Sequence, residues 1–67
     1  MKKAFELKDG TIIYSNDVKC LIVNGIEEEY SHKKVLDAAK KIETIGAILV
    51  DGTKLNPSDI SNYHIFG

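Results

Sequence analysis

The residue types that could carry acid–base or nucleophilic chemistry are few in this chain and widely separated. His32 and His64 are the side chains that titrate near neutral pH. We expect both at the surface, His32 in the first turn of a helix and His64 beside Tyr63 in a strand. Cys20 lies in an apolar run, which favours a small buried hydrophobe over an activated nucleophile. We therefore predict no catalytic residue, no enzyme activity and no cofactor.

Metal-binding potential is also weak. Residues 27–29 are three consecutive glutamates. In a strand their side chains alternate between two faces, so neighbouring carboxylates do not converge on one ion. Cys20, His32 and His64 lack the paired spacing of a zinc site. We predict no metal site and interpret the glutamates as a solvated acidic edge.

Lysines give the one charge pattern that could bind a ligand. They recur along one predicted helix face, where they could hold the phosphates of an anionic nucleotide. Asp37 weakens this strip, and the chain has no arginine, the preferred bidentate reader of phosphate. Glycine-rich phosphate loops are absent from the sequence. The predicted ligand-binding set is Lys33, Lys34, Lys40, Lys41, Tyr63 and His64.

Composition places the chain among small globular domains. It has 67 residues, 43% hydrophobic and 28% charged, with a net charge of −1. We expect one domain over residues 1–67 with a core too small to supply much stability, which favours self-association. The single cysteine fits a reducing compartment, and no signal peptide or membrane-spanning run is evident. We therefore expect a cytoplasmic homo-oligomer, with neither nucleic acid nor a membrane as its default partner.

Three turn signals organise the strands: Asp9-Gly10, Asn24-Gly25 and Asp51-Gly52. Such pairs favour two-residue type I′ hairpin loops. In the first hairpin this loop would set Leu7 opposite Ile12 and Phe5 opposite Tyr14, with all four on the apolar face. In the second, the three glutamates would lie opposite residues 20–22.

A helix is predicted from His32 to Thr44. Val35, Ala38, Ala39 and Ile42 have helical spacing and would form its apolar face. Ser31 is a suitable N-cap. Gly46 is placed to end the helix as its C′ residue.

The resulting fold class is α+β, a small antiparallel, hairpin-rich sheet packed on one amphipathic helix in the order ββββαβββ. Its last elements are strands near residues 47–50 and 53–55, a turn at 56–59 and a strand at 60–66. We find no internal repeat in the sequence.

Function is predicted at the level of class. The first hypothesis is a non-enzymatic, self-associating interaction protein that binds or inhibits a protein partner. Its candidate anchors are the aromatic residues Tyr14, Tyr30, Tyr63 and Phe66, because aromatic side chains dominate binding hot spots. The second is an oligomer that binds or sequesters a small anionic nucleotide, in the style of compact phage accessory or anti-defence proteins. The third is a nucleic-acid-binding regulator, which rests on the lysine strip alone.

Overall fold

The computed structural model describes residues 2–66 and confirms the α+β class and the order ββββαβββ. The first half consists of β1 (Lys2–Leu7), β2 (Ile12–Tyr14), the 3₁₀ turn η1 (Ser15–Asp17), β3 (Val18–Val23) and β4 (Ile26–Glu29). Helix α1 (His32–Lys40) follows. The second half consists of β5 (Ile45–Leu49), β6 (Lys54–Leu55), the 3₁₀ turn η2 (Pro57–Asp59) and β7 (Ile60–Phe66).

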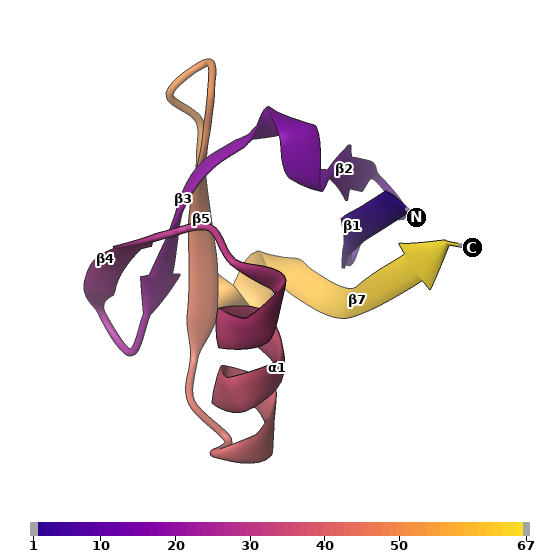
Figure 1. Ribbon diagram of the computed structural model, residues 1–67. Coiled ribbons are helices and arrows are strands. Elements are labelled where there is room, and N and C mark those ends of the chain that lie inside the picture. The colour runs from indigo at the N-terminus through magenta and orange to yellow at the C-terminus, as the bar shows by residue number, and fades with distance from the viewer. Residues whose placement is uncertain (1, 67) are drawn as a thin grey trace.

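The strands form two antiparallel sheets instead of one. A three-stranded sheet has the order β2-β1-β7 (Figure 1), and a four-stranded sheet has the order β4-β3-β5-β6. Both sheets and helix α1 contribute to a single core of small extent, in which Phe5 and Leu21 are the largest fully buried side chains. The other buried core members are Val18, Val23, Val35, Ala38, Ala47, Leu49 and Leu55.

The two halves of the chain contain the same structural unit, which corrects the expectation that no repeat is present. Each unit is a hairpin, a 3₁₀ turn and a third strand: β1-β2-η1-β3 in the first half and β5-β6-η2-β7 in the second. Corresponding residues are 42 positions apart, so that Leu7 corresponds to Leu49 and Val18 corresponds to Ile60. The strand pairing shows this equivalence, because Leu7 pairs with Ile60 and Leu49 pairs with Val18. The β1–β7 and β3–β5 pairings also have a register shift at equivalent positions. In the first it lies between Glu6 and Leu7, and in the second it lies between Val18 and Cys20.

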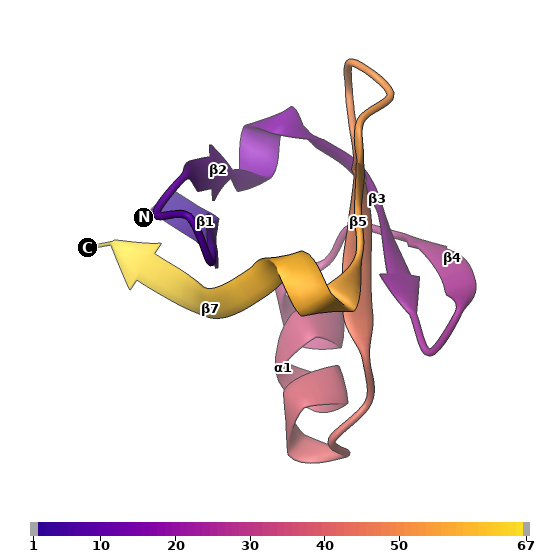
Figure 2. The same ribbon diagram turned by 180° about the vertical axis from the view of Figure 1, so that it is seen from behind.

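The units exchange their third strands. Strand β3 of the first unit pairs with β5 of the second, and β7 of the second pairs with β1 of the first. Figure 2 shows β7 crossing from the β5–β6 hairpin to lie beside β1. Neither half therefore completes a sheet by itself.

The loops of the first and third hairpins are one residue longer than predicted. Leu7 N–H donates to the carbonyl of Thr11, and Gly10 N–H donates to the carbonyl of Leu7. Gly10 has a φ of +91°, whereas Asp9 has no positive φ. This is a three-residue loop with glycine in the left-handed position, and the aspartate Oδ1 accepts from Thr11 N–H at 2.9 Å. The loop around Asp51 and Gly52 has the same bonds.

The longer loop overturns the predicted register of the first hairpin. Phe5 pairs with Ile13 instead of Tyr14, and Glu6 pairs with Ile12. A shift of one residue moves every side chain to the opposite face. Ile13 consequently packs against the core, while Ile12 and Tyr14 lie on the outer face with 38% and 43% of their surface exposed.

The second hairpin is confirmed. Asn24 and Gly25 have φ values of +54° and +84°, as a two-residue type I′ loop requires. Residues 27–29 lie opposite residues 22–20, and β4 forms an edge of its sheet.

Helix α1 ends earlier than predicted, and Gly46 is a residue of β5 instead of the helix terminator. Ile42 N–H donates to the carbonyl of Ala39, and Glu43 N–H donates to that of Ala38, which is a Schellman ending with Ile42 at C′. Ile42 therefore has a φ of +57° and is 91% exposed instead of lying on the apolar face. Val35 and Ala38 form the buried face, and Ser31 occupies the N-cap position without a side-chain cap bond.

Ile42→Gly should raise the free energy of unfolding by about 1 kcal/mol, because a β-branched residue is strained at positive φ whereas glycine is not. Urea denaturation monitored by circular dichroism measures the change. Ile42→Ala is the matched control and should gain much less, since alanine keeps a Cβ. Equal stabilisation by both variants would show that backbone strain at this position is not the cause.

Candidate functional site

The outer face of the β2-β1-β7 sheet carries apolar and aromatic side chains from its two edge strands, β2 and β7, on either side of β1. Cross-strand pairs place Tyr14 and His64 on either side of Ala4, and Phe66 beside them opposite Lys2. Ala4 is fully buried although it lies on the outer face of the sheet, which shows that the neighbouring side chains close over it. We call Ile12, Tyr14, His64 and Phe66 the aromatic face.

The rings of the aromatic face are in mutual contact. The ring centroids of Tyr14 and Phe66 lie 6.2 Å apart, and those of His64 and Phe66 lie 5.8 Å apart. Lys2 Nζ stands 5.5 Å from the Tyr14 ring centroid, within the range of a cation–π contact. Tyr14 and Phe66 each keep 43% of their surface exposed, so the patch is ordered by its own contacts yet open to a partner.

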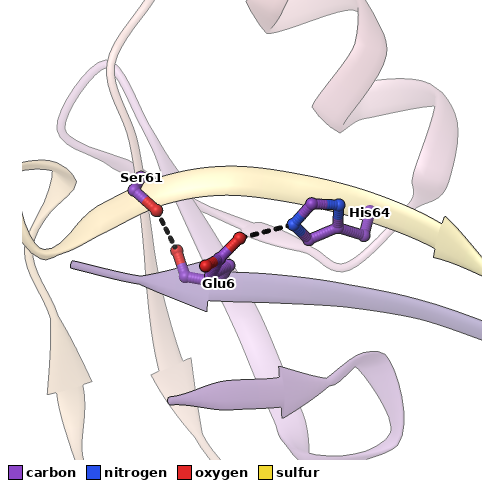
Figure 3. Close-up of polar contacts among 3 residues, drawn as sticks. All are labelled: Glu6, Ser61 and His64. Atoms are coloured by element: carbon purple, nitrogen blue, oxygen red, sulfur yellow. Dashed lines mark hydrogen bonds and ion pairs between the residues drawn. The ribbon is translucent and has the colours of Figure 1, made fainter. Parts of the chain in front are cut away.

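A polar contact joins His64 of the aromatic face to Glu6. His64 Nε2 lies 2.6 Å from Glu6 Oε1, and Ser61 Oγ donates to the Glu6 carbonyl at 3.2 Å (Figure 3). Both side chains are about a third exposed, so the contact contributes little stability. The serine hydroxyl bonds to a backbone carbonyl and the histidine bonds to the carboxylate. The three groups are therefore not connected as nucleophile, base and orienting acid.

A second polar cluster lies on the opposite face of β7. The hydroxyl oxygens of Tyr30 and Tyr63 are 2.6 Å apart, and His32 Nδ1 is 3.0 Å from the Tyr63 oxygen. The Tyr63 ring contacts Phe5, with centroids 5.0 Å apart, and stacks on His32. His32, at the start of α1, is thus hydrogen-bonded to and stacked on Tyr63, instead of being the solvated side chain that was predicted. This cluster fastens the start of the helix to β7.

Burial raises the pKa of Tyr63 well above the ordinary 10.0, and the hydrogen bond with Tyr30 and that residue's charge raise it further. The neutral phenol is therefore the form that the fold stabilises.

An apolar groove of about 370 Å³ opens between helix α1 and β7. Its walls include Val35, Leu36 and Ala39 of the helix and residues 60–63 of β7. Leu36 is 40% exposed at its rim. The groove therefore presents apolar side chains beside the outer edge of β7.

The predicted ligand-binding residues do not converge on one point. Lys34 Nζ lies 3.4 Å from Glu28 Oε1, so this lysine faces β4. Lys40 and Lys41 are at the end of the helix away from His32, which contacts Tyr63. Tyr63 and His64 point to opposite faces of β7 and belong to different clusters.

The predicted interface anchors form two pairs. Tyr14 and Phe66 meet on the aromatic face, whereas Tyr30 and Tyr63 meet in the polar cluster. Sequence reasoning missed Ile12 as part of the aromatic face because the assumed loop length turned β2 over. Cys20 is half-buried, with Sγ 4.0 Å from Glu27 Oε1, and is less enclosed than predicted.

Two further features concern the described part of the chain. Among residues 2–66, no group of three or more histidine, cysteine, aspartate or glutamate side chains is placed to hold a metal ion. None of the described residues belongs to a helix whose length and apolar content would let it cross a membrane.

Comparison with known proteins returned no matching family model, no matching curated protein and no matching solved structure.

Tyr63→Phe should cost about 1 kcal/mol at pH 7, because the Tyr30 hydroxyl and His32 Nδ1 lose their shared partner. It should also change the pH dependence of stability. The raised pKa means that wild-type stability is fully present below pH 10.0 and is lost as pH rises, since the unfolded phenol ionises first. The variant should lose less over this range. Urea unfolding from pH 8 to pH 11 tests this, with Tyr14→Phe as the control; parallel curves for wild type and Tyr63→Phe would contradict it.

Proposed function

We propose that this protein is a small non-enzymatic interaction protein that binds a protein partner through its aromatic face and also self-associates. The observation that carries the proposal is the contact of Phe66 with both Tyr14 and His64 beside a fully buried Ala4. Aromatic residues held rigidly at a surface bury large areas at low entropic cost, which is what a binding hot spot needs.

Polar and charged side chains lie beside the aromatic face, so its partner would need both apolar and polar groups. Lys2 lies on one side over Tyr14, and the Glu6–His64 pair lies within the same face. Polar groups around an apolar centre give an interface its orientation and specificity. A protein surface that offers an apolar side chain flanked by an acidic group would complement Tyr14 and Lys2.

Self-association is supported by the size of the core. Phe5 and Leu21 are the largest side chains that are fully buried among the described residues. A domain with so little enclosed apolar volume gains stability when exposed strands and apolar surface are covered by another subunit.

Photo-crosslinking tests the aromatic face directly. A benzophenone amino acid at Tyr14 should give a discrete crosslinked species in cells, because this exposed position lies within the proposed interface. The same group at Val50, which is 63% exposed on the β5–β6 hairpin, should give none. A species heavier than two copies of the chain identifies a protein partner. Equal crosslinking at both positions, or none at Tyr14, would count against the proposal.

A small anionic ligand is the second candidate, favoured by a hollow of about 370 Å³ at the end of the β2-β1-β7 sheet. Lys2 and Lys3 provide positive charge, and Ser15 and Asn16 provide hydrogen-bonding groups. Its residues differ from the lysines predicted on the helix. The hollow is lined by Lys2, Lys3, Tyr14, Ser15, Asn16 and Asp17.

Thermal denaturation with nucleoside mono-, di- and triphosphates tests this candidate. Binding to the folded state should raise the melting temperature as ligand concentration rises, and Lys2→Ala with Lys3→Ala should abolish the rise. Lys40→Ala with Lys41→Ala is the matched control and should retain it. A melting temperature that no phosphate ligand changes would eliminate the candidate.

A further inference from the structure

Among residues 2–66, no strand pairs with the outer edge of β7, and the internal repeat suggests which kind of element would cover it. Strand β3, the counterpart of β7, pairs with β5 on one side and with β4 on the other. Strand β7 pairs with β1 and ends its sheet (Figure 1). The second unit thus lacks the strand that the first unit acquires from β4.

The repeat also identifies the free backbone groups. Asn24 N–H donates to the carbonyl of Thr44, on the β5 side of β3. Because backbone N–H and C=O groups alternate along a strand, those of Ile22 also point to β5, while those of Leu21 and Val23 point to β4. The counterparts of Leu21 and Val23 in β7 are Tyr63 and Ile65. The backbone N–H and C=O groups of Tyr63 and Ile65 therefore point outward from the open edge of β7.

We propose that a second copy of this chain covers this edge, with the two β7 strands pairing antiparallel about a two-fold axis. This inference rests on the proposed self-association and names its surface. The two sheets would join into one continuous sheet with the order β2-β1-β7-β7-β1-β2. Such an isologous contact closes at two subunits, because each copy uses its single β7 edge.

Charge favours β7 over β4 as the pairing edge. Strand β4 presents Glu27, Glu28 and Glu29, so two copies of that edge would set carboxylates against one another. Residues 62–66 of β7 contain no lysine and no acidic residue, and its histidine is already paired with Glu6. Two β7 edges therefore meet without like-charge repulsion from acidic or lysine side chains.

The register follows from the free peptide groups and from the irregularity near Ser61. The register of β7 against β1 shifts between Asn62 and Ile60, so the regular stretch is residues 62–66. Tyr63 of one copy and Ile65 of the other can then exchange hydrogen bonds, which puts His64 opposite His64 on the axis. Ile65, now 48% exposed, would lie beside Tyr63 of the other copy, next to the groove lined by α1.

The same register extends the aromatic face. Because His64 and Phe66 lie on the outer face of the sheet, pairing about His64 brings the aromatic faces of both subunits side by side. The partner-binding surface would then be a single patch shared by the dimer.

Sedimentation velocity over a range of concentrations tests the proposal. Wild type should dimerise, and Ile65→Pro, which removes an outward N–H without touching a bond to β1, should weaken dimerisation at least about tenfold. Ile65→Lys keeps the backbone donor but places a charge beside the groove, and it should also weaken the dimer. Glu27→Pro is the matched edge proline on β4 and should leave dimerisation unchanged. Circular dichroism confirms that each variant is folded.

The outcomes separate this inference from the proposed function. A dimer that survives both Ile65 substitutions retains self-association but overturns the β7 edge as its surface, and loss of the dimer in Glu27→Pro would assign it to β4. A monomeric wild type at every concentration would overturn self-association altogether, leaving partner binding to be judged by the crosslink at Tyr14.

A disulfide test checks the register. In a Cys20→Ser background, His64→Cys should form an intersubunit disulfide under mild oxidation, because opposed residues in a non-hydrogen-bonded pair have Cα atoms about 4.5 Å apart. Ser61→Cys lies on the same strand outside the regular stretch and should crosslink much less. Equal crosslinking at both positions would overturn the His64-centred register.

Discussion

The exchange of strands between the two halves is the interaction on which the rest of the structure depends. Each half brings a hairpin whose first strand needs a neighbour, and each supplies that neighbour to the other half through β3 or β7. The buried residues of the core consequently come from both units. Strand β4 and helix α1 form the segment between the units, and the helix closes the core through Val35 and Ala38.

Local turn chemistry and hydrophobic spacing predict the elements well. The class, the element order, the Asn24-Gly25 loop and the acidic edge strand all follow from residues near one another in sequence. The first hairpin was misjudged because Asp-Gly suits both a two-residue loop and the left-handed end of a three-residue loop. That single residue decides whether Ile13 or Tyr14 faces the core. The candidate site therefore depended on a choice that pattern alone does not settle.

The repeat escaped sequence inspection because most of its identical residues lie in loops and turns, whereas the identical pair Leu7 and Leu49 packs in or against the core. The identical pairs include Leu7 with Leu49 and Asp17 with Asp59, together with the Asp-Gly-Thr loops. The aspartates of the loops accept a hydrogen bond from the threonine N–H, and the glycines adopt positive φ. Core positions have diverged, as in Phe5 against Ala47, because volume lost in one unit can be filled from the other or from the helix.

Successive side chains of β7 point to opposite faces of the sheet, and the two faces have different roles. Tyr63 faces inward and joins the helix to the sheet through two hydroxyl contacts, while its neighbour His64 faces outward among Tyr14, Phe66 and Glu6. One strand thus both closes the fold and builds the candidate interface. A substitution in β7 can change binding through stability as well as through contact.

The pairing of β1 with β7 also sets the order in which the protein can form. The hairpins close over loops of two or three residues, whereas Lys2 meets Phe66 only after nearly the whole chain has been drawn together. Closing a long loop costs entropy that is recovered only when the new strand packs, so such contacts form late. The aromatic face contains residues of β2 and of β7, which come together only when β7 pairs with β1. It therefore exists only in molecules that have finished folding, and partly folded chains do not display it.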